Sequence, residues 1–138
     1  MTDAPQPDEA ALVAAAWQAR TSAICTYSGF AVGAALRDAE GRVWTGANVE
    51  NASYTLGLCA ERVAIFWALT HGARDFTHVV VVTDTARPTS PCGACRQILV
   101  EFAPKAQVVM VAREGEPLRL SVAELVPHAF DDAALGRG

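Results

Sequence analysis

The sequence predicts an α/β fold with a single mixed sheet of about five strands, covered by helices on both faces. Two observations support this prediction. After an initial hairpin, short apolar runs of strand length alternate with amphipathic stretches of helix length. The chain has 138 residues, close to the usual size of one domain, and 51% of them are hydrophobic, enough for one core. We therefore expect a single domain over residues 1–138, with residues 1–7 frayed.

The first half of the chain predicts a helix followed by a hairpin. Residues 9–22 are expected to be helical, because their apolar side chains recur at helical spacing. That stripe consists of Leu12, Val13, Ala16 and Trp17. An apolar strand is expected over 33–36 and its return strand over 43–49. The segment 38–41 between them carries turn residues and ends in glycine.

The second half predicts alternating helices and strands. Residues 59–70 show a second helical stripe, ended by a cap at His71 and Gly72, and the β-branched run 78–82 is typical of a strand buried on both faces. A third helix is expected over 92–102, opened by Thr89, Ser90 and Pro91, because serine is a good N-cap and proline suits the first helical position. The remaining elements are a buried strand at 108–111, an edge strand at 118–120 and a short helix at 121–125 with Glu124 in a capping box.

Charge and hydropathy exclude several classes of protein. Eleven Lys and Arg against fifteen Asp and Glu give a net charge of −4, whereas a nucleic-acid binder normally carries a basic stripe for phosphates. No apolar run approaches the roughly 18 residues of a membrane-spanning helix. The first residues are acidic and contain two prolines, unlike a signal peptide. We therefore expect a cytoplasmic protein that binds neither nucleic acid nor membranes.

Four cysteines are the first candidates for chemistry. Cys92 and Cys95 form a C-x-x-C pair, Cys59 precedes them by 33 residues, and Cys25 stands apart. In a reducing compartment such thiols indicate a metal site, redox chemistry or packing, and the C-x-x-C pair alone leaves these open. A thioredoxin-type motif needs no third cysteine, and a closed structural zinc site needs a fourth ligand, for which Cys25, His71 and His78 are candidates.

The position of three cysteines at helix starts favours a metal. Cys59 begins one expected helix, and Cys92 and Cys95 lie in the first turns of another. The partial positive charge of a helix N-terminus lowers the pKa of a thiol and favours the thiolate that a metal needs. Zinc held by three protein ligands keeps a fourth position open, the catalytic arrangement. Glu61 follows as a candidate proton shuttle, and the guanidinium of Arg62 could offset the thiolate charge.

At these residues the chain resembles the zinc-dependent cytidine deaminases, in the compact homotetrameric subfamily. The resemblance spans nearly the whole chain, and its blocks together are far more specific than any one of them. The matching stretches are 27–36 (YSGFAVGAAL), 46–54 (GANVENASY), 59–62 (CAER), 91–97 (PCGACRQ) and, in the family's tail, 125–130 (LVPHAF).

The resemblance implies a zinc site and a reaction. Cys59, Cys92 and Cys95 are expected to bind one zinc ion per chain, which activates water for attack on C4 of cytosine. Glu61 is expected to move protons from water to N3 and to the departing ammonia, and Arg62 to balance the thiolate charge. The implied reaction is the hydrolytic deamination of free cytidine and 2′-deoxycytidine to uridine and 2′-deoxyuridine, in pyrimidine salvage.

The resemblance also implies the substrate contacts. Asn48 and Glu50 are expected to bind the ribose, and a carboxylate there would repel a phosphate and so favours a free nucleoside. Phe30 is expected to form an aromatic wall against the base, and Phe130 to reach the site of a neighbouring subunit in a homotetramer. The remaining contacts come from backbone groups of Ala52 and Ala60 and from the hydroxyl of Tyr54.

Other interpretations stay open at this point. Without the family match, Asn48 and Glu50 would be solvent-facing strand residues, and Phe30 and Phe130 would belong to the core. A different class of function is a non-enzymatic zinc-binding or thiol-redox module. A blasticidin-S-type deaminase shares C-A-E and P-C-G-x-C-R-Q, but the stretch 48–51 (NVEN) speaks against it.

Overall fold

Five strands form one sheet in the order β2-β1-β3-β4-β5. The computed structural model describes residues 7–136. The pair β3–β4 is parallel and the other three pairs are antiparallel, so the sheet is mixed, as predicted. The strands are β1 (Val32–Asp38), β2 (Val43–Ala47), β3 (Phe76–Thr83), β4 (Gln107–Val111) and β5 (Leu118–Ser121).

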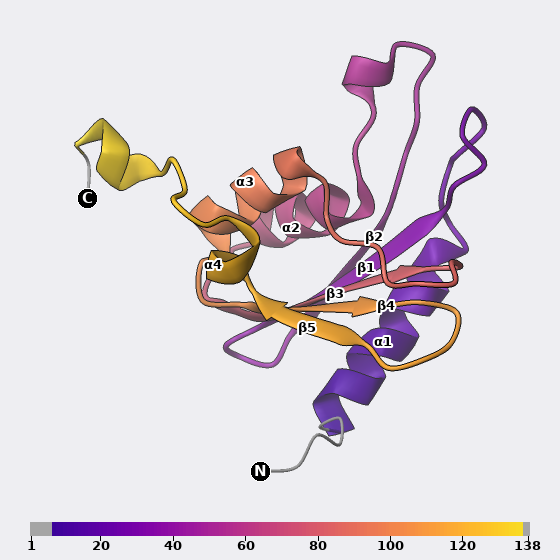
Figure 1. Ribbon diagram of the computed structural model, residues 1–138, viewed down its shortest axis with the longest axis horizontal. Coiled ribbons are helices and arrows are strands. Elements are labelled where there is room, and N and C mark those ends of the chain that lie inside the picture. The colour runs from indigo at the N-terminus through magenta and orange to yellow at the C-terminus, as the bar shows by residue number, and fades with distance from the viewer. Residues whose placement is uncertain (1–6, 137–138) are drawn as a thin grey trace.

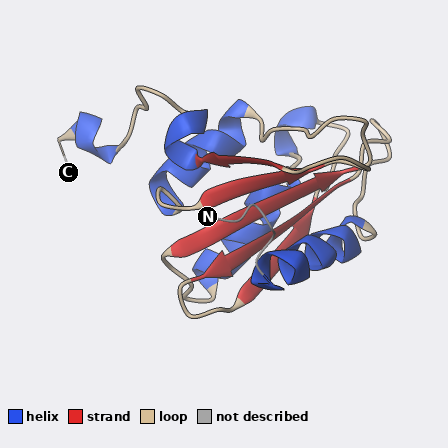
Figure 2. Cartoon of the chain, turned by 60° about the horizontal axis from the view of Figure 1, so that its bottom comes forward, coloured by secondary structure: helices blue, strands red, loops and turns tan. Residues whose placement is uncertain are grey.

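Helices cover both faces of the sheet (Figures 1 and 2). They are α1 (Pro7–Arg20), α2 (Ala60–Thr70), α3 (Gly93–Phe102) and α4 (Val122–Leu125), with 3₁₀ turns η1 (Tyr54–Leu56) and η2 (Asp132–Leu135). Within residues 7–136, every helix is too short or too polar to cross a bilayer. The expectation of a frayed 1–7 concerns residues outside the described part, apart from Pro7, where α1 begins.

The core is divided between the two faces by the alternation of the strands. Helix α1 packs Leu12 and Ala16 against Ala35, Val80 and Val82, all buried. The intervening residues of β1 and β3 face the other side, where α2, α3 and α4 cover them. This second cluster contains Ala34, Leu36, Val79 and Val81 of the strands, Ala64, Ile65 and Ala68 of α2, Leu99 of α3, and Val122 and Leu125 of α4.

Two predicted boundaries are wrong in an instructive way. Helix α3 has Cys92 as its N-cap, with extended backbone angles of φ −67° and ψ 168°, rather than Ser90 followed by Pro91. Strand β2 ends at Ala47 instead of residue 49, because Val49 leaves the sheet and forms isolated bridges with Ile24 and Leu58. The capping box between Ser121 and Glu124 is confirmed.

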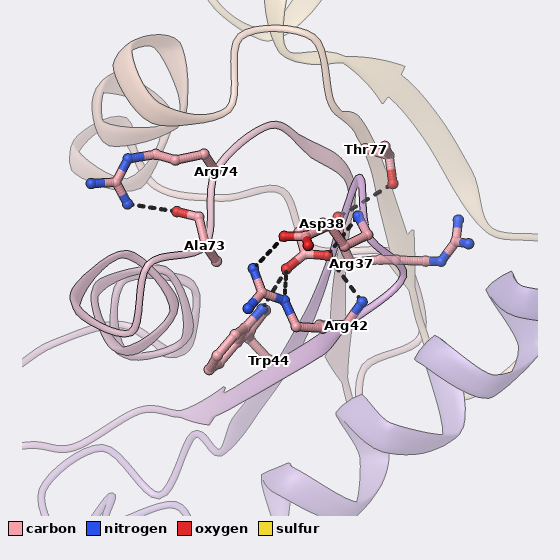
Figure 3. Close-up of polar contacts among 8 residues, drawn as sticks. Arg37, Asp38, Arg42, Trp44, Ala73, Arg74 and Thr77 are labelled. Carbon is pink, nitrogen blue, oxygen red and sulfur yellow. Dashed lines mark hydrogen bonds and ion pairs between the residues drawn. The ribbon is translucent and has the colours of Figure 1, made fainter.

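The hairpin turn is held by a buried carboxylate (Figure 3). Asp38 accepts hydrogen bonds from the indole of Trp44 at 3.1 Å, from Nε of Arg42 at 2.8 Å, and from the backbone N–H groups of Glu40 and Arg42, both at 2.9 Å. Burial opposes ionisation, but these donors outweigh it and hold the pKa of Asp38 below its usual value. Trp44 in turn packs edge-on against Trp67 of α2, with ring centroids 5.1 Å apart.

Strand direction brings both helix starts to one edge of the sheet. Because β1 is antiparallel to β2 and to β3, and β4 is parallel to β3, the strands β2, β3 and β4 run the same way. Their carboxyl ends, at Ala47, Thr83 and Val111, define what we call the carboxyl edge, where β1 also begins at Val32. Helix α2 follows β2 and α3 follows β3, so both begin at this edge, the usual place for ligand sites in α/β sheets.

Candidate active site

Three cysteine sulfurs converge at the carboxyl edge. The Sγ atoms of Cys59 and Cys92 are 3.6 Å apart and those of Cys92 and Cys95 are 3.5 Å apart, and all three lie within 4.8 Å of one another. A disulfide would need about 2.05 Å, and all three thiols are free. Tetrahedral zinc with Zn–S bonds of about 2.3 Å would place its sulfurs about 3.8 Å apart. The three thiols therefore fit a single zinc ion.

The helix starts favour thiolates at this cluster. Cys59 is the N-cap of α2 and Cys92 is the N-cap of α3, while Cys95 is buried in the first turn of α3. A hydrogen bond from the Cys95 thiol and the nearby guanidinium of Arg62 lower the pKa of Cys59 to about 5, although burial opposes them. A thiolate is thus stable here near neutral pH, as metal binding requires.

Arg62 lies beside the sulfurs, as its expected role requires. Its Nη2 is 3.5 Å from Sγ of Cys59. Its buried Nε has no hydrogen-bond partner among the residues that the structure describes. The guanidinium therefore places a positive charge beside the thiol cluster.

Glu61 is a buried carboxyl next to the cluster. Its side chain belongs to the first turn of α2, and the residue is 4% exposed. Burial is the main cause that raises the pKa of Glu61, to about 7. A carboxyl with a pKa near neutral can both accept and return a proton.

Two adjoining cavities open beside the sulfurs and share Ser28, Asn48, Glu50 and Cys59. The larger cavity, of about 380 Å³, is also lined by Tyr54 and Arg62. The smaller, of about 270 Å³, is also lined by Phe30, Val32, Ala60, Glu61, Val81, Thr83, Thr89, Ser90 and Cys92. Their combined size suits a small organic ligand.

Glu50 is fixed as an anion at the boundary between the cavities. One carboxylate oxygen accepts the backbone N–H groups of Tyr27 and Ser28, both at 3.0 Å, and the other accepts the Ser28 hydroxyl. The Ser28 hydroxyl is the largest cause that lowers the pKa of Glu50. Glu50 thus presents a preorganised acceptor to a ligand in the shared mouth.

Asn48 has a structural contact that the sequence did not predict. Its Nδ2 donates to the carbonyl of Phe30 and its Oδ1 accepts the N–H of Val32, both at 2.8 Å. The side-chain amide therefore holds the loop that places Phe30 on the wall of the smaller cavity. Asn48 and Glu50 line both cavities, so they face the same space.

Some expected contact residues lie apart from this cluster. Within residues 7–136, neither cavity is lined by Phe130 or Ala52. Phe130 is 62% exposed, its carbonyl accepts from Gln97, and the chain after α4 extends away from the sheet (Figure 1). Tyr54 lines the larger cavity but is 77% exposed, with its ring 6.0 Å from that of Tyr27.

Two residues that organise the site, Ser28 and Arg96, were not predicted from the sequence. Ser28 holds Glu50, and its place beside Phe30 in the matching block was the available signal. Arg96 donates to the carbonyl of Pro91 at 2.8 Å, to the hydroxyl of Ser90 at 2.9 Å and to the carbonyl of Leu125 at 3.0 Å. Arg96 thereby ties the loop before Cys92 to α4.

The fold and the three-thiol cluster define a zinc-binding deaminase domain. Residues 6–111 match the family described as "Cytidine and deoxycytidylate deaminase zinc-binding region", and the chain belongs to this family.

Individual relatives agree with the family match. A cytidine deaminase of Halalkalibacterium halodurans is 48% identical over 124 residues, which cover 89% of this chain and 94% of that protein. One of Sporosarcina psychrophila is 43% identical, over 86% of this chain and 88% of that protein. The solved cytidine deaminase from Burkholderia pseudomallei is 45% identical with a TM-score of 0.85, over 94% of this chain and 100% of that chain. The predicted family and fold are therefore confirmed.

Proposed function

We propose that this protein is a zinc-dependent hydrolase that converts free cytidine and 2′-deoxycytidine to uridine and 2′-deoxyuridine, with release of ammonia, in pyrimidine salvage. The observation that carries the proposal is the convergence of three sulfurs, two of which, in Cys59 and Cys92, belong to residues lining a cavity that is also lined by Glu61 and reaches Glu50. Relatives named cytidine deaminase, 48% and 43% identical to this chain, support the same activity.

The metal would be held by Cys59, Cys92 and Cys95, one ion per chain. Zinc bound there supplies a Lewis acid that lets water ionise near neutral pH. Three protein ligands leave room for water, which is the arrangement of catalytic rather than structural sites. Arg62, whose Nη2 is 3.5 Å from the Cys59 sulfur, would offset the excess negative charge of three thiolates.

Glu61 would carry the protons of the reaction. It would take a proton from the attacking water, protonate N3 of the base and deliver a proton to the amine that leaves C4. Cytidine and water are thereby converted to uridine and ammonia, with no other reactant. Such acid–base help is typically worth about 10²–10⁴-fold in rate.

The substrate would be a nucleoside rather than a nucleotide. Glu50, a preorganised anion, and Asn48 would bind the ribose hydroxyls, while Phe30 would cover the base. Among the described residues that line the two cavities, Arg62 is the basic one, and it lies against the thiols. A 5′-phosphate near Glu50 would therefore meet like charge. The remaining contacts would come from backbone groups of Ala52 and Ala60 and from the Tyr54 hydroxyl.

The protein would work as a homotetramer. Phe130 is 62% exposed and, within the described chain, lies outside both cavities, as expected for a residue that completes a neighbour's site. Phe130→Ala should then strongly reduce activity and leave the melting temperature nearly unchanged. Sedimentation would give the subunit number, and full activity in a monomer would contradict this part of the proposal.

The cytoplasm would be the compartment of this enzyme. Free thiols 3.5 Å and 3.6 Å apart are prone to oxidation, so the site needs a reducing environment or bound metal. Fractionation of the native host with an antibody would test this localisation.

The activity can be tested with two variants and three substrates. The wild type should deaminate cytidine and 2′-deoxycytidine, which is measured as a loss of the cytosine absorbance. Its kcat/KM for 2′-deoxycytidine 5′-phosphate should be at least about 100-fold lower, because charge repulsion raises the free energy of the bound state by about 3 kcal/mol. Glu61→Gln should keep zinc and lose most turnover, whereas Cys92→Ala should lose zinc. A wild type that binds zinc but turns over none of the three substrates would favour a non-enzymatic zinc module.

A further inference from the structure

Three threonine hydroxyls form a hydrogen-bonded chain at one wall of the smaller cavity. Thr83, the last residue of β3, is 1% exposed. Its Oγ1 lies 2.8 Å from that of Thr85 and 3.2 Å from that of Thr89. Thr85 donates to the carbonyl of Arg87 at 2.6 Å. Thr83 and Thr89 line the cavity, whereas Thr85, within the described chain, does not.

A count of the hydroxyl protons leaves one at Thr89 for a ligand. Each hydroxyl has one proton and two lone pairs. Thr85 uses its proton on the Arg87 carbonyl, so Thr83 is the donor in their 2.8 Å contact and shares its one proton with Thr89, to which it donates at 3.2 Å. Because Thr89 accepts in its contact with Thr83, the acceptor that the described structure offers to the Thr89 proton is the Thr85 oxygen, 3.5 Å away, at the limit of a hydrogen bond. The Thr89 hydroxyl can therefore donate to, or accept from, a group in the cavity.

Given the proposed function, the position of the ribose indicates which part of the base contacts Thr83 and Thr89. The ribose, on N1, is held at Asn48 and Glu50 in the shared mouth. C4 lies opposite N1 across the pyrimidine ring, so its exocyclic group points to the far end of the smaller cavity. Thr83, Thr89, Ser90 and Cys92 line the smaller cavity and are not among the residues that it shares with the larger one.

We infer that Thr89 is a specificity-determining residue that hydrogen-bonds the exocyclic group at C4, with Thr83 as its positioning partner. The reaction replaces an amine, which donates, by a carbonyl oxygen, which accepts. A hydroxyl suits both, because rotation of one O–H bond changes it from acceptor to donor. A backbone carbonyl or N–H at the same place would match one of the two. The inference rests on the proposed function and adds the residue that recognises the group being exchanged.

The decisive comparison uses two ligands that share the ribose and O2 and differ at C4 and in the proton on N3; the difference at N3 is the same for the wild type and every Thr89 variant, so it cancels when they are compared. Uridine carries oxygen at C4, and pyrimidin-2-one riboside carries hydrogen. Thr89→Val, nearly equal in shape, should raise the inhibition constant of uridine and lower kcat/KM for cytidine, each by about five- to tenfold, the size of one net hydrogen bond. The inhibition constant of pyrimidin-2-one riboside should stay within about twofold, and Thr89→Ser should restore the two values that change.

Thr85→Val is the matched control. It removes the two shortest bonds of the hydroxyl chain, at 2.6 Å and 2.8 Å, without touching the cavity. If the chain merely holds its loop, Thr85→Val should have the larger effect, and that result would overturn the inference. So would an equal loss of both ligands in Thr89→Val, or in Thr89→Ala if the valine variant is unstable.

Two further measurements separate the possible failures. Zinc content and melting temperature should match the wild type in every Thr89 variant. A wild type without turnover would reject the proposed function together with this inference, whereas an active wild type whose Thr89 variants treat uridine and the C4-unsubstituted riboside alike would reject the role of Thr89 alone.

Discussion

Adding one methyl group at Gly46 should disturb the metal site without touching a site residue. Gly46 lies on β2, directly under α2. A Cβ there would lie 2.6 Å from the backbone nitrogen of Ala64 and 2.7 Å from the carbonyl oxygen of Ala60. Both neighbours are helix backbone, which cannot rotate away as a side chain could. Gly46→Ala therefore has to push α2 off the sheet.

The size of that displacement sets the expected effect. An ordinary carbon contact is about 3.5 Å, so α2 must move by about 0.8 Å. Overpacking of this kind costs typically 1–3 kcal/mol, and we expect about 3 kcal/mol here, or about 10 °C in melting temperature. Metal ligand distances tolerate about 0.2 Å. Because α2 carries Cys59 and α3 carries the other two thiols, the shift should weaken zinc binding by at least about tenfold.

The assay pairs thermal unfolding with zinc competition against a chromogenic chelator. Gly93→Ala is the control: the same chemical change between Cys92 and Cys95, at a position where an added Cβ meets nothing within 4 Å. The control should keep its zinc and its melting temperature. A Gly46→Ala variant that holds zinc as tightly as Gly93→Ala would refute the view that contact between β2 and α2 places Cys59.

Three further changes test other parts of the structure. Asp38→Asn should cost about 2 kcal/mol at pH 7 by urea unfolding. Because the pKa of Asp38 is lowered in the fold, its stabilisation is complete above the ordinary value of 3.8 and is lost as the pH falls through the folded value, so the variant should show a smaller loss of stability in acid. Ser28→Ala removes a donor to Glu50 and should raise KM for cytidine about fivefold with little change in kcat. Arg62→Leu should weaken zinc binding about tenfold in a chelator competition, because it removes the charge beside Cys59.

Each of these has an outcome that contradicts it. An acid transition of Asp38→Asn that parallels the wild type would mean that the pKa of Asp38 is the same in the folded and the unfolded chain. A fall in kcat alone for Ser28→Ala would mean that Glu50 does not act in ground-state binding. Unchanged zinc affinity in Arg62→Leu would show that the helix N-termini alone balance the thiolates.

Local patterns predicted much of the fold and the metal cluster. The run 78–82 of β-branched residues indicated a buried strand, and β3 contains it. The spacing of Cys92 and Cys95 places two thiols on one side of a helix start, and a third thiol at another helix start completes the set. These features are set by neighbours in the chain, so periodicity and motif spacing detect them.

Contacts between distant segments could not be predicted from the sequence. Glu50 binds Ser28 across 22 positions, and the amide of Asn48 holds the carbonyl of Phe30 across 18. No periodicity of the sequence indicates such pairs, because they depend on how β1 and β2 pair in the folded chain. The N-cap of α3 was also misplaced: serine and proline are good helix starters, but the chain stays extended to Cys92, where Arg96 binds the Pro91 carbonyl.

The direction of the strands explains why a three-thiolate site is tenable here. Three thiolates and one Zn²⁺ leave a net negative charge, which would weaken the pull of the metal on water. Each helix N-terminus contributes about half a positive charge, and Arg62 contributes a full one. Both helix ends face the sulfurs because β2 and β3 run the same way, so α2 and α3 begin at the same edge. If α2 instead ended at this edge, the sulfurs could still meet, but a partial negative charge would face them. The topology therefore supplies part of the electrostatics of the metal site as well as its position.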